Sequence, residues 1–371
     1  MKRPGLSAVF LSLAALLLCL VAVETVLVIW DQPQSNSPRR ACFTEPLTFY
    51  PGQGDDPGRF YTLSPKSLYL NIYDSNPDGY FEAGNTITIE VNNLGFRGDD
   101  IIDGDRSFTG LKVAFLGDSF TLGEGVKIRD TFAEKIAARI NADPDRTVPV
   151  KSYNFGMPGY NTTQAYWALK TWVLPLRPDL VVLGYFLNDA AGPYFTRDPR
   201  TGRISGDPAN PFFWPALADG PPAGLYRLRT ARLIRQRIQK ALVARRTVDY
   251  YLGLYTPQNP HWETNRHHLK AIIHECRRHR IGLVVVCLPV FYRLDEDYPF
   301  KKIHQTVREV VAAEAAAGSP VFVDMLPYFQ GLDSRRLWVH PSDHHPNALA
   351  HAMIADVLAP IVVDLLDEHS R

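Results

Sequence analysis

One serine of this sequence follows a pattern that could prepare it for nucleophilic attack. The apolar residues 113–116 end abruptly in Gly117, Asp118 and Ser119, and a helix-like segment follows. This order places a serine hydroxyl at the carboxyl end of a buried strand, where open α/β sheets bind their ligands. By itself the pattern could also be a turn followed by a serine that caps a helix.

A base and an acid for that serine occur near the C-terminus. Residues 342–347 read Ser-Asp-His-His-Pro-Asn, so Asp343 precedes His345 by two positions. A serine hydroxyl is a weak nucleophile until a neighbouring base takes its proton, and a carboxylate holds an imidazole in the pose that does so. The residues therefore predict a triad of Ser119, His345 and Asp343. If Asp343 points away, a dyad of Ser119 and His345 remains.

The elements that must position these residues follow the rhythm of an α/β protein. From residue 111 onwards, short apolar segments alternate with helical ones, which is typical of parallel βαβ units. We therefore expect an α/β fold: a doubly wound, flavodoxin-like, three-layer structure around a five-stranded parallel sheet. The expected strands are 113–116, 148–153, 180–186, 282–288 and 320–323, and the expected helices are 131–140, 163–174, 262–280, 304–317 and 348–366.

Four blocks of the chain resemble the SGNH hydrolase superfamily, also called GDSL esterases and lipases, in both order and spacing. They are residues 117–119, 154–160, 187–189 and 343–347, within a resemblance that covers residues 93–366. The resemblance implies that Ser119 is the nucleophile, His345 the base and Asp343 its partner. One departure concerns the third block, where Phe186 stands in the place of the usual glycine.

The same resemblance implies an oxyanion hole. Its donors would be the backbone amides of Ser119 and Gly159 and the side-chain amide of Asn188. Attack on an ester carbonyl puts negative charge on the oxygen, and each donor aimed at that oxygen is typically worth about 10²–10³-fold in rate. Each of the three follows a different expected strand, so they can converge although they are far apart in the sequence.

The N-terminus has the pattern of an uncleaved signal anchor. After Lys2 and Arg3, residues 6–23 are almost all apolar, and the apolar run resumes after Glu24 as far as Trp30. About 20 apolar residues span a bilayer, and basic residues stay on the cytoplasmic side. A cleaved signal peptide and a lipoprotein signal fit less well, because neither cleavage pattern is present. We expect a single-pass protein of a bacterial inner membrane, with its body on the periplasmic side.

The anchor, residues 1–30, is followed by a polar, proline-rich linker over residues 31–42 and a β-rich lead-in over residues 43–108. The hydrolase domain, residues 109–371, carries an insertion at about 191–258 that is basic between residues 227 and 246. That basic stretch is either a solvated helix face, which we favour, or a patch for an anionic glycan or lipid head group. Pairing of Cys42 with Cys276 is left open.

Several other classes of protein are disfavoured. A net charge of +1 provides no strong attraction to nucleic acid. No glycine fingerprint for phosphate or dinucleotides is present, so no cofactor is expected. His340, His344, His345 and Asp343 could form a zinc ligand set, but no matching ligands occur on another element, so no metal is expected either.

These features predict a serine esterase that acts on acyl groups, most simply acetyl, of a small-molecule, glycan or lipid substrate near the cell envelope. A close variant is an O-acyltransferase that passes the acyl group to a sugar hydroxyl. A different class is a glycan-binding assembly protein on a degraded hydrolase scaffold.

Residues 92–98 resemble a segment that precedes the first block in envelope-associated members of the superfamily. Arg97 of this segment would contact substrate, brace the active-site rim or form a structural salt bridge.

Overall fold

The computed structural model describes residues 14–15, 17–26, 39–42, 47–50, 59–198, 200–206, 230, 246–316 and 319–369. The chain divides into two compact units. One comprises Met1–Ser35 and Pro208–Asp249, and the other comprises Asn36–Asp207 and Tyr250–Arg371. Most of the basic stretch between residues 227 and 246 lies outside the described residues, and so do most of the expected linker and the ends of the expected anchor.

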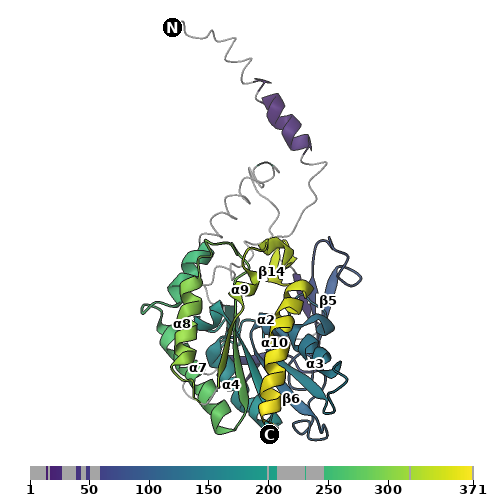
Figure 1. Cartoon of the computed structure of the whole chain (residues 1–371). Helices are drawn as coiled ribbons and strands as arrows, with labels where there is room; N and C mark the ends of the chain where they lie inside the picture. The colour runs from purple at the N-terminus through teal and green to yellow at the C-terminus, as the bar shows by residue number, and fades with distance from the viewer. Residues whose placement is uncertain are drawn as a thin grey trace. The chain divides into compact units, whose positions relative to one another are not determined.

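A five-stranded parallel sheet forms the centre of the larger unit, as the sequence predicts (Figure 1). Its strands run in the order β12-β11-β8-β6-β7. They are β6 (Leu111–Gly117), β7 (Val150–Gly156), β8 (Leu180–Phe186), β11 (Gly282–Leu288) and β12 (Val321–Asp324). All seven residues of β8 and of β11 are buried, because helices cover both faces of the sheet and such strands need apolar residues on both sides.

The strand order creates one point at which the chain changes direction across the sheet. The first strand, β6, lies between β7 and β8, and the later strands continue outwards from β8. In open α/β sheets this switch point opens a crevice at the carboxyl ends of the strands, where ligands bind. Gly117 at the end of β6 pairs in register with Gly156 of β7 and Gly184 of β8, so the three strand ends lie side by side.

Helices cover both faces of the sheet (Figure 1). Their starts are capped locally: Thr131 accepts from the Glu134 amide, and Asn161 forms a capping box with Gln164. The longer helices are α3 (Phe132–Asn141), α4 (Thr162–Ala168), α7 (Pro260–Arg278), α8 (Lys301–Ala312) and α10 (Ala348–His369). Short helical segments are α2 (Ser119–Leu122), η1 (Ile128–Asp130), η2 (Leu169–Val173), α5 (Leu174–Leu176), η3 (Leu187–Ala190), α9 (Leu326–Phe329) and η5 (Ser334–Arg336).

Small antiparallel sheets surround this core. The expected β-rich lead-in contains a hairpin that pairs β4 (Leu68–Ile72) with β5 (Thr86–Glu90). The other strands are β1 (Arg39–Cys42) beside β4, β2 (Leu47–Tyr50) with β3 (Phe60–Leu63), β9 (Phe195–Arg197) with β10 (Ile204–Gly206), and β13 (Trp338–His340) with β14 (Asp343–Pro346). The β13–β14 hairpin matters most for function, because it holds both predicted partners of Ser119.

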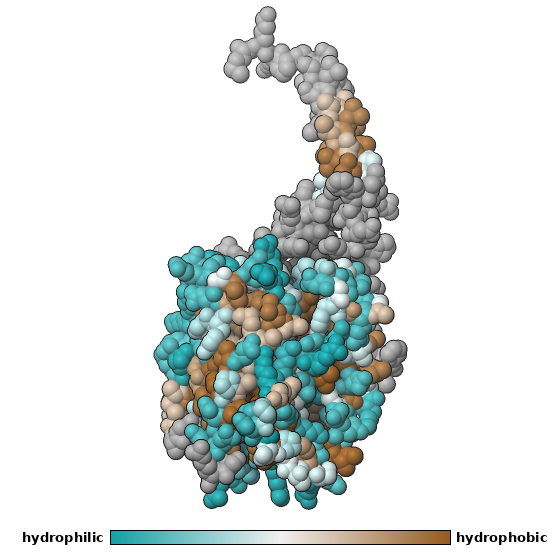
Figure 2. Space-filling view, turned by 45° about the vertical axis from the view of Figure 1, so that its right-hand side comes forward, coloured by the Kyte–Doolittle hydropathy of each residue, from teal (hydrophilic) through white to brown (hydrophobic). Residues whose placement is uncertain are grey.

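Two apolar helices bear on the expected membrane anchor. Among the described residues, Ala348–Glu368 is long and apolar enough to span a membrane, but half of its most apolar window is buried in the protein, where α10 packs on α3. Leu17–Val26 is a shorter apolar helix whose leucine and valine side chains are exposed, as the hydrophobic colouring of Figure 2 shows. An exposed apolar helix is the pattern of a segment that binds lipid or another apolar surface.

Buried His351 of α10 should make the fold sensitive to acid. Its Nδ1 accepts from the Phe132 amide at 3.1 Å, and burial lowers the pKa of His351 to about 3. The unfolded chain takes up this proton near pH 6.5, so the stability contributed by neutral His351 is lost as the pH falls below that value, at roughly 1.4 kcal/mol per pH unit.

We therefore expect His351→Gln, which retains an acceptor for Phe132, to flatten the pH dependence of stability between pH 6.5 and 4.5. Urea unfolding at both values measures the change. The matched control is the exposed His279, replaced in the same way. An equal pH dependence in wild type and His351→Gln would contradict the expectation.

Candidate active site

Ser119 lies at the switch point of the sheet. It follows β6 directly and is the first residue of the short helix α2. The cap of that helix is Asp118, whose carboxylate accepts from the Phe120 amide at 2.9 Å, so the capping role that was the alternative for Ser119 belongs to its neighbour. The Ser119 side chain is thereby left available for other contacts.

The structure brings the predicted base and acid to this serine. The Ser119 Oγ lies 2.9 Å from His345 Nε2, and His345 Nδ1 lies 2.5 Å from Asp343 Oδ1. Because Nδ1–H donates to a carboxylate, Nε2 is left as the acceptor of the serine hydroxyl proton. The three side chains form one continuous chain of hydrogen bonds.

Asp343 and His345 share a face because of their strand. Both lie on β14, and residues two positions apart in a strand point to the same side. This strand was not among the expected ones, because a hairpin strand of four mostly polar residues is too short to be recognised from its pattern. Asp343 is buried, whereas His345 is partly exposed.

The two predicted oxyanion donors that follow β7 and β8 occupy loops at the same sheet edge. Gly159 lies in the loop after β7, and the Met157 amide of that loop donates to Gly117 O at 3.1 Å. Gly159 has a φ of +73°, and a Cβ there would lie 2.6 Å from the Cβ of Tyr194. Asn188 lies in η3 directly after β8, with its side chain beside the Asp118 carboxyl.

Residues 115–353 match the model of the GDSL-like Lipase/Acylhydrolase family. The chain belongs to this family. It is a serine hydrolase of the SGNH type. No curated protein matches the chain.

The chain is similar to several solved structures at low sequence identity. An acetylxylan esterase from Geobacillus stearothermophilus, solved as a catalytic mutant, is 14% identical with a TM-score of 0.40, over 68% of this chain and 95% of that chain. A lipase/acylhydrolase from Enterococcus faecalis is 17% identical with a TM-score of 0.38, over 67% and 96%. A lipase from a goat rumen metagenome is 12% identical with a TM-score of 0.40, over 67% and 96%.

Two buried carboxyl groups, those of Asp118 and Asp189, lie at the sheet edge that carries Ser119. Burial raises the pKa of Asp118 to about 7, although the Phe120 amide, His345 and Asn188 favour its charged form. Burial and the neighbouring Asp118 raise the pKa of Asp189 well above its usual range. Asp189 Oδ2 accepts from the Phe186 amide at 2.6 Å and so closes the turn that carries Asn188. Both carboxyl groups are thus structural supports of the loops.

Arg97 supports the loop that follows Ser119. Its buried guanidinium donates to the carbonyl oxygens of Leu122, Gly123 and Val126 at 3.0, 2.7 and 2.7 Å. Burial lowers the pKa of Arg97 to about 10. The sequence left three roles open for Arg97: substrate contact, bracing of the active-site rim and a structural salt bridge. These hydrogen bonds favour the second.

Three phenylalanine rings pack together next to Ser119 and His345 and are called the aromatic wall. The Phe186 ring, in the place of the family's glycine, stacks on Phe120 with centroids 3.9 Å apart, and Phe291 lies 6.1 Å from Phe120. The Phe120 ring also lies 5.4 Å from the His345 ring. The residue that departs from the family pattern, Phe186, is therefore packed against the aromatic residue that follows Ser119.

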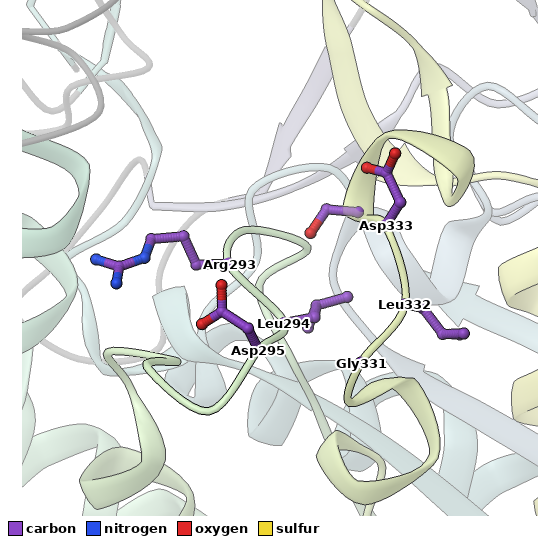
Figure 3. A pocket seen from close by; sticks show the side chains of 7 residues that line it. Arg293, Leu294, Asp295, Gly331, Leu332 and Asp333 are labelled. Carbon is purple, nitrogen blue, oxygen red and sulfur yellow. The ribbon is translucent and has the colours of Figure 1, made fainter.

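A pocket of about 250 Å³ occupies another part of the surface. It is lined by residues 293–295, after β11, and 331–334, after α9 (Figure 3). Its charged residues have local partners, since Arg293 pairs with Asp297 at 3.2 Å and Asp333 pairs with Arg335 at 2.7 Å. No predicted site residue is among its seven lining residues, so we do not assign the acyl group to it.

The residues that could have formed a zinc site have other contacts. His340 Nε2 lies 2.9 Å from Ser75 Oγ, and its Nδ1 lies 2.7 Å from Ser342 Oγ. The His344 ring stacks on Trp338 with centroids 3.7 Å apart. The His340 and His344 rings therefore each contact neighbouring side chains.

The sequence reasoning missed Glu124, a carboxylate that is 1% exposed and whose Oε2 lies 3.6 Å from His345 Nε2. The one sequence feature that could have identified Glu124 is its position five residues after Ser119. A carboxylate at this distance favours a protonated imidazole at His345.

We expect Glu124→Gln to move the acid limb of the kcat/KM profile to lower pH, because the free imidazole then binds its proton less tightly, and to lower kcat several-fold. Stopped-flow hydrolysis of an aryl acetate from pH 5 to 9 measures both. An unchanged acid limb would show that the carboxylate does not act on His345.

Proposed function

We propose that this acylhydrolase is a serine esterase that removes ester-linked acyl groups, most simply acetyl groups, from a cell-envelope substrate through an acyl-enzyme on Ser119. The observation that carries the proposal is the unbroken hydrogen-bond chain Ser119–His345–Asp343 at the switch point of the sheet. Such a chain supplies a nucleophile, a base and the group that orients the base.

The proposed reaction has two steps. Ser119 Oγ attacks the acyl carbon while its proton moves to His345 Nε2; the bond to the alcohol oxygen then breaks, and Nε2 returns the proton to that oxygen. Water next gives a proton to Nε2 and adds to the acyl carbon, and the bond to Ser119 Oγ breaks as Oγ regains a proton. The acid is released and the enzyme is restored.

In both steps negative charge develops on the carbonyl oxygen. We propose the backbone amides of Ser119 and Gly159 and the side-chain amide of Asn188 as its donors. Their positions support this assignment, because each follows one of three strands whose ends are adjacent in register. Donors that are already in place lower the barrier without a cost of reorganisation in the transition state.

We propose a short acyl group because of the aromatic wall. Phe120, Phe186 and Phe291 are each at most 5% exposed, so their rings are packed and do not leave an open channel at that wall. Enlarging a packed site costs free energy, which favours a short acyl chain such as acetyl. An O-acyltransferase uses the same acyl-enzyme and differs only in which acceptor reaches it. A non-catalytic glycan-binding protein has no use for the aligned triad.

For the location, we propose a single-pass anchor over residues 1–30, a linker over residues 31–42 and a periplasmic body that begins with the lead-in of residues 43–108. The apolar run and the basic residues before it support the anchor and its orientation. The hydrolase domain would then comprise residues 109–371, with the insertion at about 191–258.

The decisive experiment combines labelling with turnover on the full chain in detergent. A fluorophosphonate probe should label wild type and not Ser119→Ala, and aryl esters should be hydrolysed faster with acetyl than with octanoyl groups. Glycan acceptors are then added to the aryl acetate assay. Transfer to the acceptor without hydrolysis would favour the acyltransferase, and an inert wild type would favour the binding protein.

A further inference from the structure

The β-rich lead-in contacts the catalytic loops although it lies outside the residues that match the family. The match begins at residue 115, whereas the described parts of the lead-in are residues 47–50 and 59–108. Tyr73, directly after β4, donates from its hydroxyl to Asp343 Oδ2 at 2.9 Å. The hydrogen-bond chain of the triad therefore extends to a residue 270 positions away.

Packing fixes the Tyr73 ring. It is 3% exposed and stacks on Phe81 with centroids 4.3 Å apart and planes within 7°. The surrounding core joins Ile87 of β5 to Val126, in the loop after the nucleophile, and to Val339 of β13. One small core thus connects the lead-in to the two segments that carry the nucleophile and the base.

The nucleophile loop leaves room for the Tyr73 hydroxyl. A Cβ on Gly125 would lie 2.5 Å from that oxygen, so the hydroxyl sits directly against the backbone of the loop. Gly125 has a φ of +80°, which glycine adopts without strain. A side chain at this position would push the phenol away from Asp343.

Further contacts of the lead-in reach the remaining loops. Ser75 lies 2.9 Å from His340 Nε2, at the β13 end of the hairpin that holds the base. Tyr61 donates to Pro158 O at 2.8 Å, next to the proposed oxyanion glycine, and Arg97 binds the carbonyls after Ser119. The lead-in is therefore in contact with each of the three regions on which the proposed chemistry depends.

We propose that Tyr73 of the lead-in is a positioning residue that orients Asp343 toward His345. The proposal rests on the function proposed above. Asp343 binds His345 through Oδ1 and Tyr73 through Oδ2, so rotation about its Cβ–Cγ bond would break one contact or the other. A carboxylate held at both oxygens keeps the imidazole in the pose that accepts the serine proton.

Removing the hydroxyl has two consequences. Asp343 loses the contact at Oδ2 and is held less firmly, which lowers the fraction of enzyme with an aligned His345. Its charge is also less satisfied, so it attracts a proton on the imidazole more strongly, and the acid limb of the kcat/KM profile moves to higher pH. The other titratable groups that face the pair stay in place: Glu124, Asp118, His340, Asp74 and His351.

The test compares Tyr73→Phe with Tyr80→Phe in the full chain. Tyr80 is a matched control, because it lies in the same lead-in and donates to Asp130, a carboxylate outside the triad, at the same 2.9 Å. For Tyr73→Phe we expect kcat for an aryl acetate to fall roughly 10- to 100-fold, as for loss of a hydrogen bond to a charged group, with KM within about twofold. The acid limb of the kcat/KM profile should move to higher pH. Tyr80→Phe should leave both kcat and the position of this limb unchanged.

A double-mutant cycle separates positioning from a general loss of structure. In an Asp343→Asn background, Tyr73→Phe should have little further effect on kcat, because its target is already lost. The proposal is overturned if Tyr73→Phe keeps the wild-type kcat and acid limb, if both tyrosine variants lose activity equally, or if the two effects multiply in the cycle. An inactive wild type would instead contradict the proposed function.

Discussion

Replacing His345 with alanine is expected to lower kcat for aryl acetate hydrolysis by about 10⁴-fold or more. The Ser119 hydroxyl then has no base at 2.9 Å and keeps its proton, so it does not attack. Steady-state kinetics on the purified full chain, at a substrate concentration well above KM, measures the loss. The neighbouring His344 is the matched control, because it is exposed and stacks on Trp338, away from the triad. Its replacement by alanine should leave kcat within a few-fold of wild type.

The His345→Ala substitution also tests whether Ser119 and His345 act as a unit. Ser119→Ala combined with His345→Ala should be no slower than either single variant, because each already disables the same step. Multiplicative losses would mean that the two side chains act independently. A His345→Ala variant that retains a tenth of the wild-type kcat would remove His345 from the mechanism.

Gly159→Ala is expected to lower kcat by roughly 10²–10³-fold, the range found for loss of one oxyanion donor. The new methyl group would meet Tyr194 at 2.6 Å, and φ of +73° is unfavourable for alanine, so the loop must move and take its amide with it. The measurement is kcat together with probe labelling, because the loop shift should slow both while the triad stays intact.

Gly79→Ala is the control for backbone strain alone. Gly79 has a similar φ of +65°, but nothing lies within 4 Å of a Cβ at that position. Alanine there should cost about 1 kcal/mol of folding stability and leave kcat unchanged. Equal losses of kcat in the two variants would show that strain, and not donor placement, explains the result at Gly159.

The parts of the fold that the sequence predicts well are those with a strong local signal. β8 and β11 are buried on both faces, so each reads as a continuous apolar run, and the expected bounds agree with the structure. β7 ends at Gly156, three residues later than expected, because Asn154 looks like a loop residue. Its side chain binds Thr121 O at 2.9 Å within the fold, a contact that local sequence does not reveal.

Ser119, His345 and Asp343 could be selected from the sequence because residue type and block order restrict the chemistry that they can perform. The roles of Gly159 and Asn188 came from the family pattern. The strand β14 was not expected, since a four-residue polar strand has no recognisable periodicity. The contact between Asp343 and His345 depends on the two-residue repeat of that strand.

The sequence by itself determined the class of chemistry, the order of the strands' buried segments and the residues able to activate a hydroxyl. Only the tertiary structure decided what surrounds them: Glu124 beside His345, Arg97 beneath the nucleophile loop and Tyr73 on Asp343. The physical reason is the difference in sequence separation between the residues that each kind of information relates. Strand periodicity and motif spacing are properties of neighbouring residues, whereas a phenol reaches a carboxylate 270 positions away only when an intervening core has packed.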